Sequence, residues 1–353
     1  MTPTTPSTPT RGGLFWPVAP ARHRVGARLF RTLVGLGFMY QFGILYGQRA
    51  LLFGPEALSP YEDFVATFGT AHFSLLALNP SEAWFELVYH ATLLVLGVWT
   101  AGFATRWTTP LVWLGVHTIH ARTADIWDGG DNLMHIVLLF AVLLDLRPAA
   151  AVAKESPAAT HREGAGDAAP VRVRDVLHNV ALLACAIQVC IVYVVAGIFK
   201  LGGKYWVNGT AFYYVLNSNE FGFSRSLAPI IWNSPLVLSV MTWAPVVMQL
   251  AFPFVYLFGS AMSRRVLVLT AISFHLGIFA LMGLETFAVF MIAAELLLLS
   301  DDDYAFVRRV FGAVRSLPAR LRGPTRPATD HPDRPDASGA SGASGPSGPG
   351  TTA

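Results

Sequence analysis

Eight apolar segments alternate with polar stretches along the chain. Most have about the 20 residues that a helix needs to cross a bilayer. The third and the fourth are short and are expected to tilt little or to lie partly in a cavity. The pattern predicts an all-α, polytopic membrane protein with about eight transmembrane helices. The segments are 29–48, 83–104, 107–121, 132–147, 175–200, 235–258, 265–282 and 284–299.

The polar stretches divide the chain into four regions. Residues 1–24 are rich in Thr and Pro, and residues 323–353 consist largely of Gly, Ser and Pro, so both are predicted to be disordered tails. Residues 25–300 hold the transmembrane domain. Residues 301–322 form an amphipathic, basic segment that we expect to lie in the cytoplasm.

Composition supports placement in the cell membrane. Hydrophobic residues make up 53% of the 353 residues and charged residues only 13%, about half of the charged share in soluble domains. The net charge of +3 is small, and the basic residues lie between apolar segments. A soluble carrier and a nucleic-acid-binding protein are therefore excluded, and membrane lipid is the expected surrounding.

The basic residues predict the orientation of the helices, because Lys and Arg are enriched in cytoplasmic loops. With the N-terminus inside and eight crossings, both termini are cytoplasmic. Twenty of the 25 Lys and Arg residues then lie inside. The five on the outer side are Arg49, Arg122, Lys200, Lys204 and Arg225.

Ionisable side chains inside membrane spans are rare and usually line a protein interior or a wet cavity. In the predicted topology, such residues on several segments fall in the outer leaflet. We expect a polar pocket that opens to the extracytoplasmic side, under two long aromatic loops at 49–82 and 201–234. Its expected residues are Glu86, His90, His117, His120, Asp131, His135, Lys200, Trp206 and Glu285.

Structural roles are the alternatives for several of these residues. Asp131 follows two glycines and can cap a helix, and Glu86 and Glu285 suit helix N-termini in any case. Lys200 can extend to the headgroups. His90 and His275 can be core histidines with satisfied hydrogen bonds, and Glu295 a buried structural group.

A metal site is a further alternative at His117, His120, Asp131 and His135, because imidazole and carboxylate suit zinc or iron. The sequence lacks the H-E-x-x-H pattern there and shows no second ligand cluster. We therefore expect no bound metal, and the sequence identifies no other cofactor.

Three runs of sequence resemble the HTTM (horizontally transferred transmembrane) domain family, which is related to vitamin K-dependent gamma-carboxylase. AGIFKLGGKYWVNGTAFYYVL at 196–216 carries a small-residue pair, a lysine followed by Leu, and then Trp and Gly. HARTADIWDGGDNLMH at 120–135 is similar to the family's Arg-x-x-x-Ile-x-x-Gly-Gly-Asp element. The run at 274–299 matches its closing helices, and the resemblance covers about residues 25–300.

The resemblance implies a role for Lys200. It matches the lysine that is implicated in the carboxylase branch as the base toward vitamin K hydroquinone, and a lysine partly withdrawn from water can act as a base. Asp131, His120 and His135 would position groups or relay protons. The chain departs from the family pattern at Asp131, where the carboxylase has histidine, and at Gln249, where many relatives have Glu.

Two classes of function remain open, and the sequence does not decide whether the chain is an enzyme. The first is a carboxylase-like enzyme that acts on a quinone-like, lipid-soluble molecule or on a secreted peptide. The second is a non-enzymatic membrane protein for maturation, export or immunity of a secreted peptide. A transporter is disfavoured, because its sites lie near the midplane between repeated halves.

Reporter fusions test the predicted orientation. Fusions at Ala158 and Ser338 should report the cytoplasm, and a fusion near Asn219 the outside, because this arrangement leaves most basic residues inside. Alkaline phosphatase and fluorescent-protein activities measure this. An outside signal at either cytoplasmic position would contradict the common outer leaflet of the polar residues.

Overall fold

The computed structural model describes residues 21–68, 73–123, 126–154, 172–218, 221 and 228–310. The chain divides into a unit of residues 1–307 and a second of residues 308–353, and the numbered helices belong to the first. Residues 1–20 of the predicted N-terminal tail, the predicted C-terminal tail, residues 311–322 of the basic segment and residues 155–171 lie outside the described residues. Residues 21–24, which we predicted to belong to the disordered tail, are described, and Arg24 begins the first helix.

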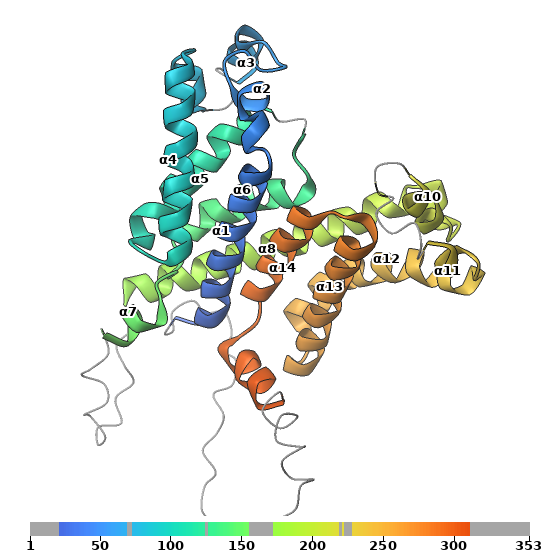
Figure 1. The fold of residues 1–353 in the computed structure, drawn as a ribbon. Coiled ribbons are helices and arrows are strands. Elements are labelled where there is room, and N and C mark those ends of the chain that lie inside the picture. Colours follow the sequence, from blue (N-terminus) through green and yellow to red (C-terminus); the bar gives the residue numbers. More distant parts are fainter. Residues whose placement is uncertain are drawn as a thin grey trace, which may run out of the picture. The chain divides into compact units, whose positions relative to one another are not determined.

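Eight helices overlap the eight predicted apolar segments, although the fourth ends at Ala141, six residues before its predicted end. No strand occurs among the described residues (Figure 1). The long helices are α1 (Arg24–Ile44), α4 (Glu82–Ala101), α5 (Thr105–Ala121), α6 (Gly129–Ala141), α8 (Val173–Leu201), α12 (Pro235–Phe258), α13 (Ala261–Met282) and α14 (Glu285–Leu297). The short ones are η1 (Tyr46–Gln48), α2 (Arg49–Phe53), α3 (Tyr61–Phe68), η2 (Leu75–Leu78), α7 (Ala149–Lys154), α9 (Lys204–Val207), α10 (Ala211–Asn217) and α11 (Ala228–Trp232).

Four of the helices, α4, α8, α12 and α13, are long and apolar enough to cross a bilayer. A fifth candidate combines α1 with the segment Tyr46–Phe53, which bends from it by 52°. Helices α5, α6 and α14 have 17, 13 and 13 residues, fewer than the about 20 that a perpendicular span requires. The architecture is thus helical with four or five candidate spans by length.

Helix α14 connects the parts of this unit, because it packs against α1, α6, α8 and α13. Its approach to α1 depends on small residues. A Cβ atom on Gly37 would lie 2.5 Å from the ring of Phe290, and one on Gly26 would lie 2.6 Å from the carbonyl oxygen of Leu296. Such small residues let helix backbones come close where no hydrophobic driving force is available.

Local sequence explains where the helices begin and end. The Ser81 and Ser234 side chains accept hydrogen bonds from the first turns of α4 and α12, and Pro235 occupies the first position of α12, where its missing N–H costs nothing. Gly283 adopts φ 72° between α13 and α14, a left-handed conformation that favours glycine. The chain reverses there, so α13 and α14 pack side by side.

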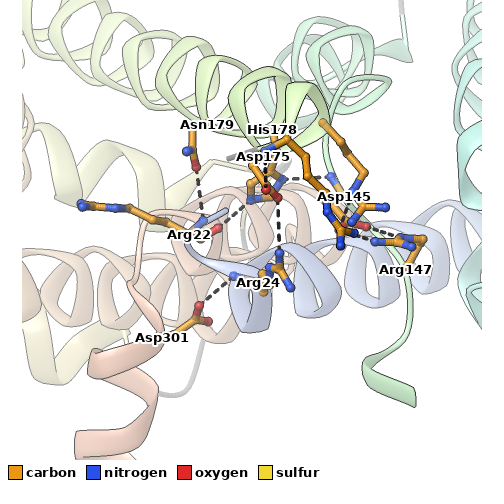
Figure 2. A network of polar contacts seen from close by, with 10 residues as sticks. Arg22, Arg24, Asp145, Arg147, Asp175, His178, Asn179 and Asp301 are labelled. Atoms are coloured by element: carbon orange, nitrogen blue, oxygen red, sulfur yellow. Dashed lines mark hydrogen bonds and ion pairs between the residues drawn. The ribbon is translucent and has the colours of Figure 1, made fainter. Parts of the chain in front are cut away.

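The first turn of α1 is capped by a residue from the other end of the unit. Asp301 accepts hydrogen bonds from the backbone N–H groups of Arg24 (3.2 Å) and Val25 (2.8 Å), as Figure 2 shows for Arg24. His23, which precedes the helix, provides no side-chain cap. The carboxylate therefore satisfies donors that a helix start leaves open, and it favours the positive end of the helix dipole.

His178 joins three segments in the same network (Figure 2). Its Nδ1 accepts from the backbone N–H of Asp145 (2.9 Å), so its Nε2 carries the proton and donates to the carbonyl of Arg22 (2.6 Å). Asn179 accepts from the N–H of Arg22 at 3.2 Å. These bonds tie the start of α8 to the segment before α1 and to the loop after α6.

Asp303 lies at the start of the helical stretch that follows α14. Its side chain links this stretch to α13. It accepts from the Ser300 hydroxyl (2.7 Å) and backbone N–H (2.9 Å), and it forms an ion pair with Arg265 of α13. Burial raises the pKa of this carboxyl, but the bonds from Ser300 and Arg265 outweigh it and hold the pKa of Asp303 below its ordinary value.

The Asp303→Asn variant tests this link. A carboxyl with a lowered folded-state pKa stabilises the fold above its unfolded value of about 4, and that contribution is lost as the pH falls through the lower folded value. We expect a loss of about 1 kcal/mol at pH 7, because partial exposure screens the ion pair. The difference from the unsubstituted protein should shrink below about pH 4 in denaturant unfolding; a pH-independent difference would contradict this role.

Candidate functional site

Three histidines from α5 and α6 come together inside the bundle. His120 Nδ1 lies 3.1 Å from His135 Nε2, and the ring of His117 lies 5.4 Å from that of His135 in an edge-on arrangement. The ring of Trp127 stacks on His135 at 4.4 Å, and Trp113 stacks on His117 at 5.5 Å. Trp113, His117 and His120 follow one another on α5 at spacings of four and three residues, which place their rings on one face of that helix.

Gln41 of α1 connects the histidines to Asp131. Its Nε2 donates to Asp131 Oδ1 (3.0 Å) and Oδ2 (3.2 Å), and its Oε1 lies 3.2 Å from His120 Nε2. Since this amide oxygen accepts only, His120 Nε2 carries a proton. His120 Nδ1 is then the acceptor for His135 Nε2–H in the neutral rings.

The direction of these bonds leaves one lone pair free in the His120–His135 pair. His135 Nδ1 is enclosed and has no hydrogen-bond partner in the described residues, and in the assigned tautomer it holds a free lone pair. A proton taken up there can pass to His120 but no further, because an amide does not relay protons as imidazole does. Gln41 and Asp131 are therefore placed to orient the two rings, and the positioning and proton-relay roles that we expected for Asp131 stay predictions.

Asp131 has a second partner within its own helix. Its Oδ2 accepts from the backbone N–H of Asp128 (3.1 Å), while Asp128 caps the first turn of α6 in return. The structural alternative for Asp131 thus holds in part, since the residue belongs to a capping box. The same carboxylate binds Gln41, so both roles are present.

Glu86 and His90 form a separate group on α4. Arg49 pairs with Glu86 at 2.9 Å, His90 Nδ1 lies 3.2 Å from the same carboxylate, and His90 Nε2 lies 3.0 Å from the Tyr46 hydroxyl. The Arg49 guanidinium also lies over the Tyr46 ring at 4.2 Å. All four side chains are at least partly exposed. This group therefore lies at the protein surface, where it stabilises the turn between α1 and α2.

Glu285 accepts a hydrogen bond from the Tyr40 hydroxyl in a groove between α1, α13 and α14. The groove has a volume of about 470 Å³ and is open to the outside of the bundle. Apart from this pair its lining is almost wholly apolar. The lining residues are Leu33, Leu36, Gly37, Tyr40, Phe279, Glu285, Thr286 and Val289.

Lys200 lies at the end of α8, and none of the ion pairs in the described structure involves it. Its Nζ is 3.4 Å from the carbonyl of Ala196 and 5.2 Å from the ring of Trp206. In the described residues, Asp131 binds Gln41 and Glu285 binds Tyr40 instead. The amine is held by a cation–π contact and one carbonyl, in a position that also fits an anchor near the headgroups.

The expected site residues therefore form four groups in the described structure. His117, His120, His135 and Asp131 come together; the other groups are Glu86 with His90, Glu285 with Tyr40, and Lys200 with Trp206. Sequence reasoning missed Gln41, which binds Asp131. The signal available was a lone amide in the apolar run GFMYQFGIL.

The histidine group offers little to a metal ion. Both nitrogens of His120 take part in hydrogen bonds, so this ring keeps no lone pair for coordination. In the ranges that the structure describes, no three His, Cys, Asp or Glu side chains are arranged to hold a metal. Hydrogen bonding and proton uptake at His135 are the chemistry that the arrangement supports.

Comparisons with known proteins give two distant relatives, both from Bacillus subtilis (strain 168). The uncharacterized protein YitO is 32% identical over 132 residues, which is 35% of this chain and 42% of YitO, so the match spans less than half of that relative. The sporulation-delaying protein SdpB is 24% identical over 279 residues, 77% of this chain and 80% of SdpB. No protein-family model matches the chain, and no solved structure matches it.

Proposed function

We propose that the chain is an HTTM-type protein of the cell membrane with eight transmembrane helices and both termini in the cytoplasm. The short helices α5, α6 and α14 then cross within the bundle, flanked by the longer spans. The coincidence of eight helices with eight apolar segments supports this arrangement, and the asymmetry of Lys and Arg supports the orientation.

The function that we propose is chemistry on a lipid-soluble molecule of the quinone type, taken up from the membrane. The observation that carries it is the groove between α1, α13 and α14. Its volume of about 470 Å³ lies in the range of small-molecule sites. Its one hydrogen-bonded pair, Tyr40 with Glu285, offers a donor and an acceptor to a polar ring, while the apolar lining accommodates a hydrocarbon tail.

The buried histidines lie one aromatic layer away from this groove. The Phe38 ring lies 5.7 Å from that of His120 and 4.4 Å from that of Phe290, which in turn contacts Gly37 in the groove. In the proposal, His135 accepts a proton, and His120 and Asp131 hold it in position.

The remaining expected residues complete the proposed extracytoplasmic pocket. Lys200 is the proposed base of a carboxylase-like reaction, and the aromatic contact with Trp206 limits access of water to the amine. In this proposal His117 belongs to the histidine group, while Glu86 and His90 lie in their own group with Arg49 and Tyr46 at the extracytoplasmic side of the bundle.

A second candidate is the maturation, export or immunity of a secreted peptide, without catalysis. The match to a sporulation-delaying protein over 80% of its length favours it. A peptide would engage the exposed aromatic residues of α9 to α11, such as Tyr205 and Tyr213, and would not need the groove.

Mass spectrometry of the protein purified in mild detergent separates the candidates. We expect a co-purified quinone-type lipid, and we expect Leu36→Trp to lose it by at least about tenfold, because the larger indole would project into the groove that the lipid occupies in this proposal. Leu36 is exposed, so the substitution leaves the core intact. Leu29→Trp, on an exposed leucine of the same helix outside the groove, is the matched control.

Each result has a definite meaning. Loss of the lipid in Leu36→Trp and retention in Leu29→Trp supports the proposal. A bound peptide in place of a quinone, or equal lipid occupancy in both variants, contradicts it.

A further inference from the structure

A small cavity lies between the end of α2, the start of α4 and the end of α5, and it shares no residue with the groove between α1, α13 and α14. Its polar side chains are those of Tyr61, Asn79, Ser81 and Arg122, and the remaining lining is apolar. The free volume of about 10 Å³ is close to the smallest that holds one water molecule. Its occupant is therefore a single small particle.

Arg122 brings a buried positive charge to this cavity. The residue is 3% exposed. Its Nη2 donates to the carbonyls of Gly54 (3.1 Å) and Ser59 (2.7 Å), and its guanidinium lies 4.9 Å from the centre of the Phe64 ring. Its Nη1 is buried and has no hydrogen-bond partner, and no carboxylate of the described residues forms an ion pair with Arg122. A buried charge without compensation is expensive.

The neighbouring side chains use their acceptors and keep their donors. Asn79 Oδ1 accepts from the backbone N–H of Ser81 at 2.9 Å, so the NH₂ group of this amide stays available. Ser81 Oγ accepts from the backbone N–H of Trp84 at 3.3 Å and keeps its hydroxyl proton, whereas Tyr61 donates its own to the carbonyl of Ala77. Ser81 is also the N-cap of α4, and the positive end of a helix dipole favours an anion.

We propose that this cavity binds one small monovalent anion of the halide type, with chloride as the common one, through Arg122, Asn79 and Ser81. A water molecule would accept the same hydrogen bonds but would leave the charge of the guanidinium uncompensated. Carboxylates and phosphates are too large for the space. The side chains of Asn79 and Ser81 are exposed, so they can shift for an ion slightly larger than water.

The ion would join the loop after α2 to the start of α4 and the end of α5. Arg122 already binds the carbonyls of Gly54 and Ser59 in this loop, and the anion would add Asn79 and Ser81 from the segment that leads into α4. Binding should therefore stabilise the fold. The assignment does not depend on the quinone-type lipid, because the two sites share no lining residue.

Thermal unfolding of the full chain in detergent tests the anion site. Sodium chloride or sodium bromide is titrated against sodium gluconate at constant ionic strength, because gluconate is too large for the cavity. A ligand that binds only the folded state raises the melting temperature with the logarithm of its concentration. We expect a rise of roughly 1–3 °C for each tenfold increase in halide above the dissociation constant.

Two variants assign the effect to the cavity. Asn79→Asp keeps the acceptor for the N–H of Ser81 and places a carboxylate at the cavity. It should abolish the halide dependence and raise the melting temperature in gluconate, because the carboxylate takes the place of the ion. Arg122→Gln removes the charge and should abolish the halide dependence as well.

Each variant has a matched control. Asn233→Asp makes the same change on an exposed asparagine directly before the N-cap of α12. Arg106→Gln makes the same change on an exposed arginine in the first turn of α5. Both controls should keep the full halide dependence, and they share any general salt effect with the unsubstituted protein.

The outcomes decide the proposal. Halide dependence that is lost in Asn79→Asp and kept in both controls supports it, whether or not Arg122→Gln folds. Equal melting temperatures of the unsubstituted protein in chloride, bromide and gluconate overturn it and assign a water molecule to the cavity. Full halide dependence in Asn79→Asp, or its loss in Asn233→Asp, also overturns it.

Discussion

A polar side chain inside a bilayer finds hydrogen-bond partners only within the protein, since lipid tails offer none. Gln41 shows how strongly this constraint shapes the molecule. Its amide lies between a carboxylate from α6 and an imidazole from α5, so three helices are fixed relative to one another by one side chain. On α14, Glu295 has the same function, because it binds Tyr193 of α8 and His275 of α13.

The two polar clusters lie on helices that share α14 as a neighbour. Helix α14 packs against α1 and α6 on the histidine side and against α8 and α13 on the other. The same helix lines the groove between α1, α13 and α14 through Glu285 and Val289. The small residues Gly26 and Gly37 keep α1 close to α14, which holds the groove and the histidines at a fixed separation.

Much of the fold follows from the sequence, because apolar run length and capping residues are local properties. Each of the eight predicted segments contains a helix, although the fourth ends at Ala141 and not at residue 147. The N-cap of α6 is Asp128, whereas the sequence suggested Asp131, which lies at the third helical position and completes the capping box. The number of helices that cross the membrane does not follow from the sequence, because α6 and α14 have only 13 residues each. Their exposure to lipid depends on which neighbours cover them.

The site was predictable in its residue types but not in its pairings. Spacing alone brings His117 and His120 to one face, and Asp131 and His135 to another. The partner of Asp131 is a glutamine 90 residues away, a distance over which no local pattern carries information. Lys200 likewise meets Trp206 and not a carboxylate, because the chain turns back into α9 directly after α8 ends.

The account depends most on hydrogen bonds between helices organising the histidine site, and a double-mutant cycle on Gln41→Leu and Asp131→Leu measures this directly. Unfolding in detergent should give a coupling free energy of about 0.6–1.7 kcal/mol, the range for hydrogen bonds between membrane helices. The pair Gln48→Leu with Asp131→Leu should be additive, because Gln48 lies in an exposed turn. Additivity of the Gln41 and Asp131 effects within about 0.3 kcal/mol would contradict the account.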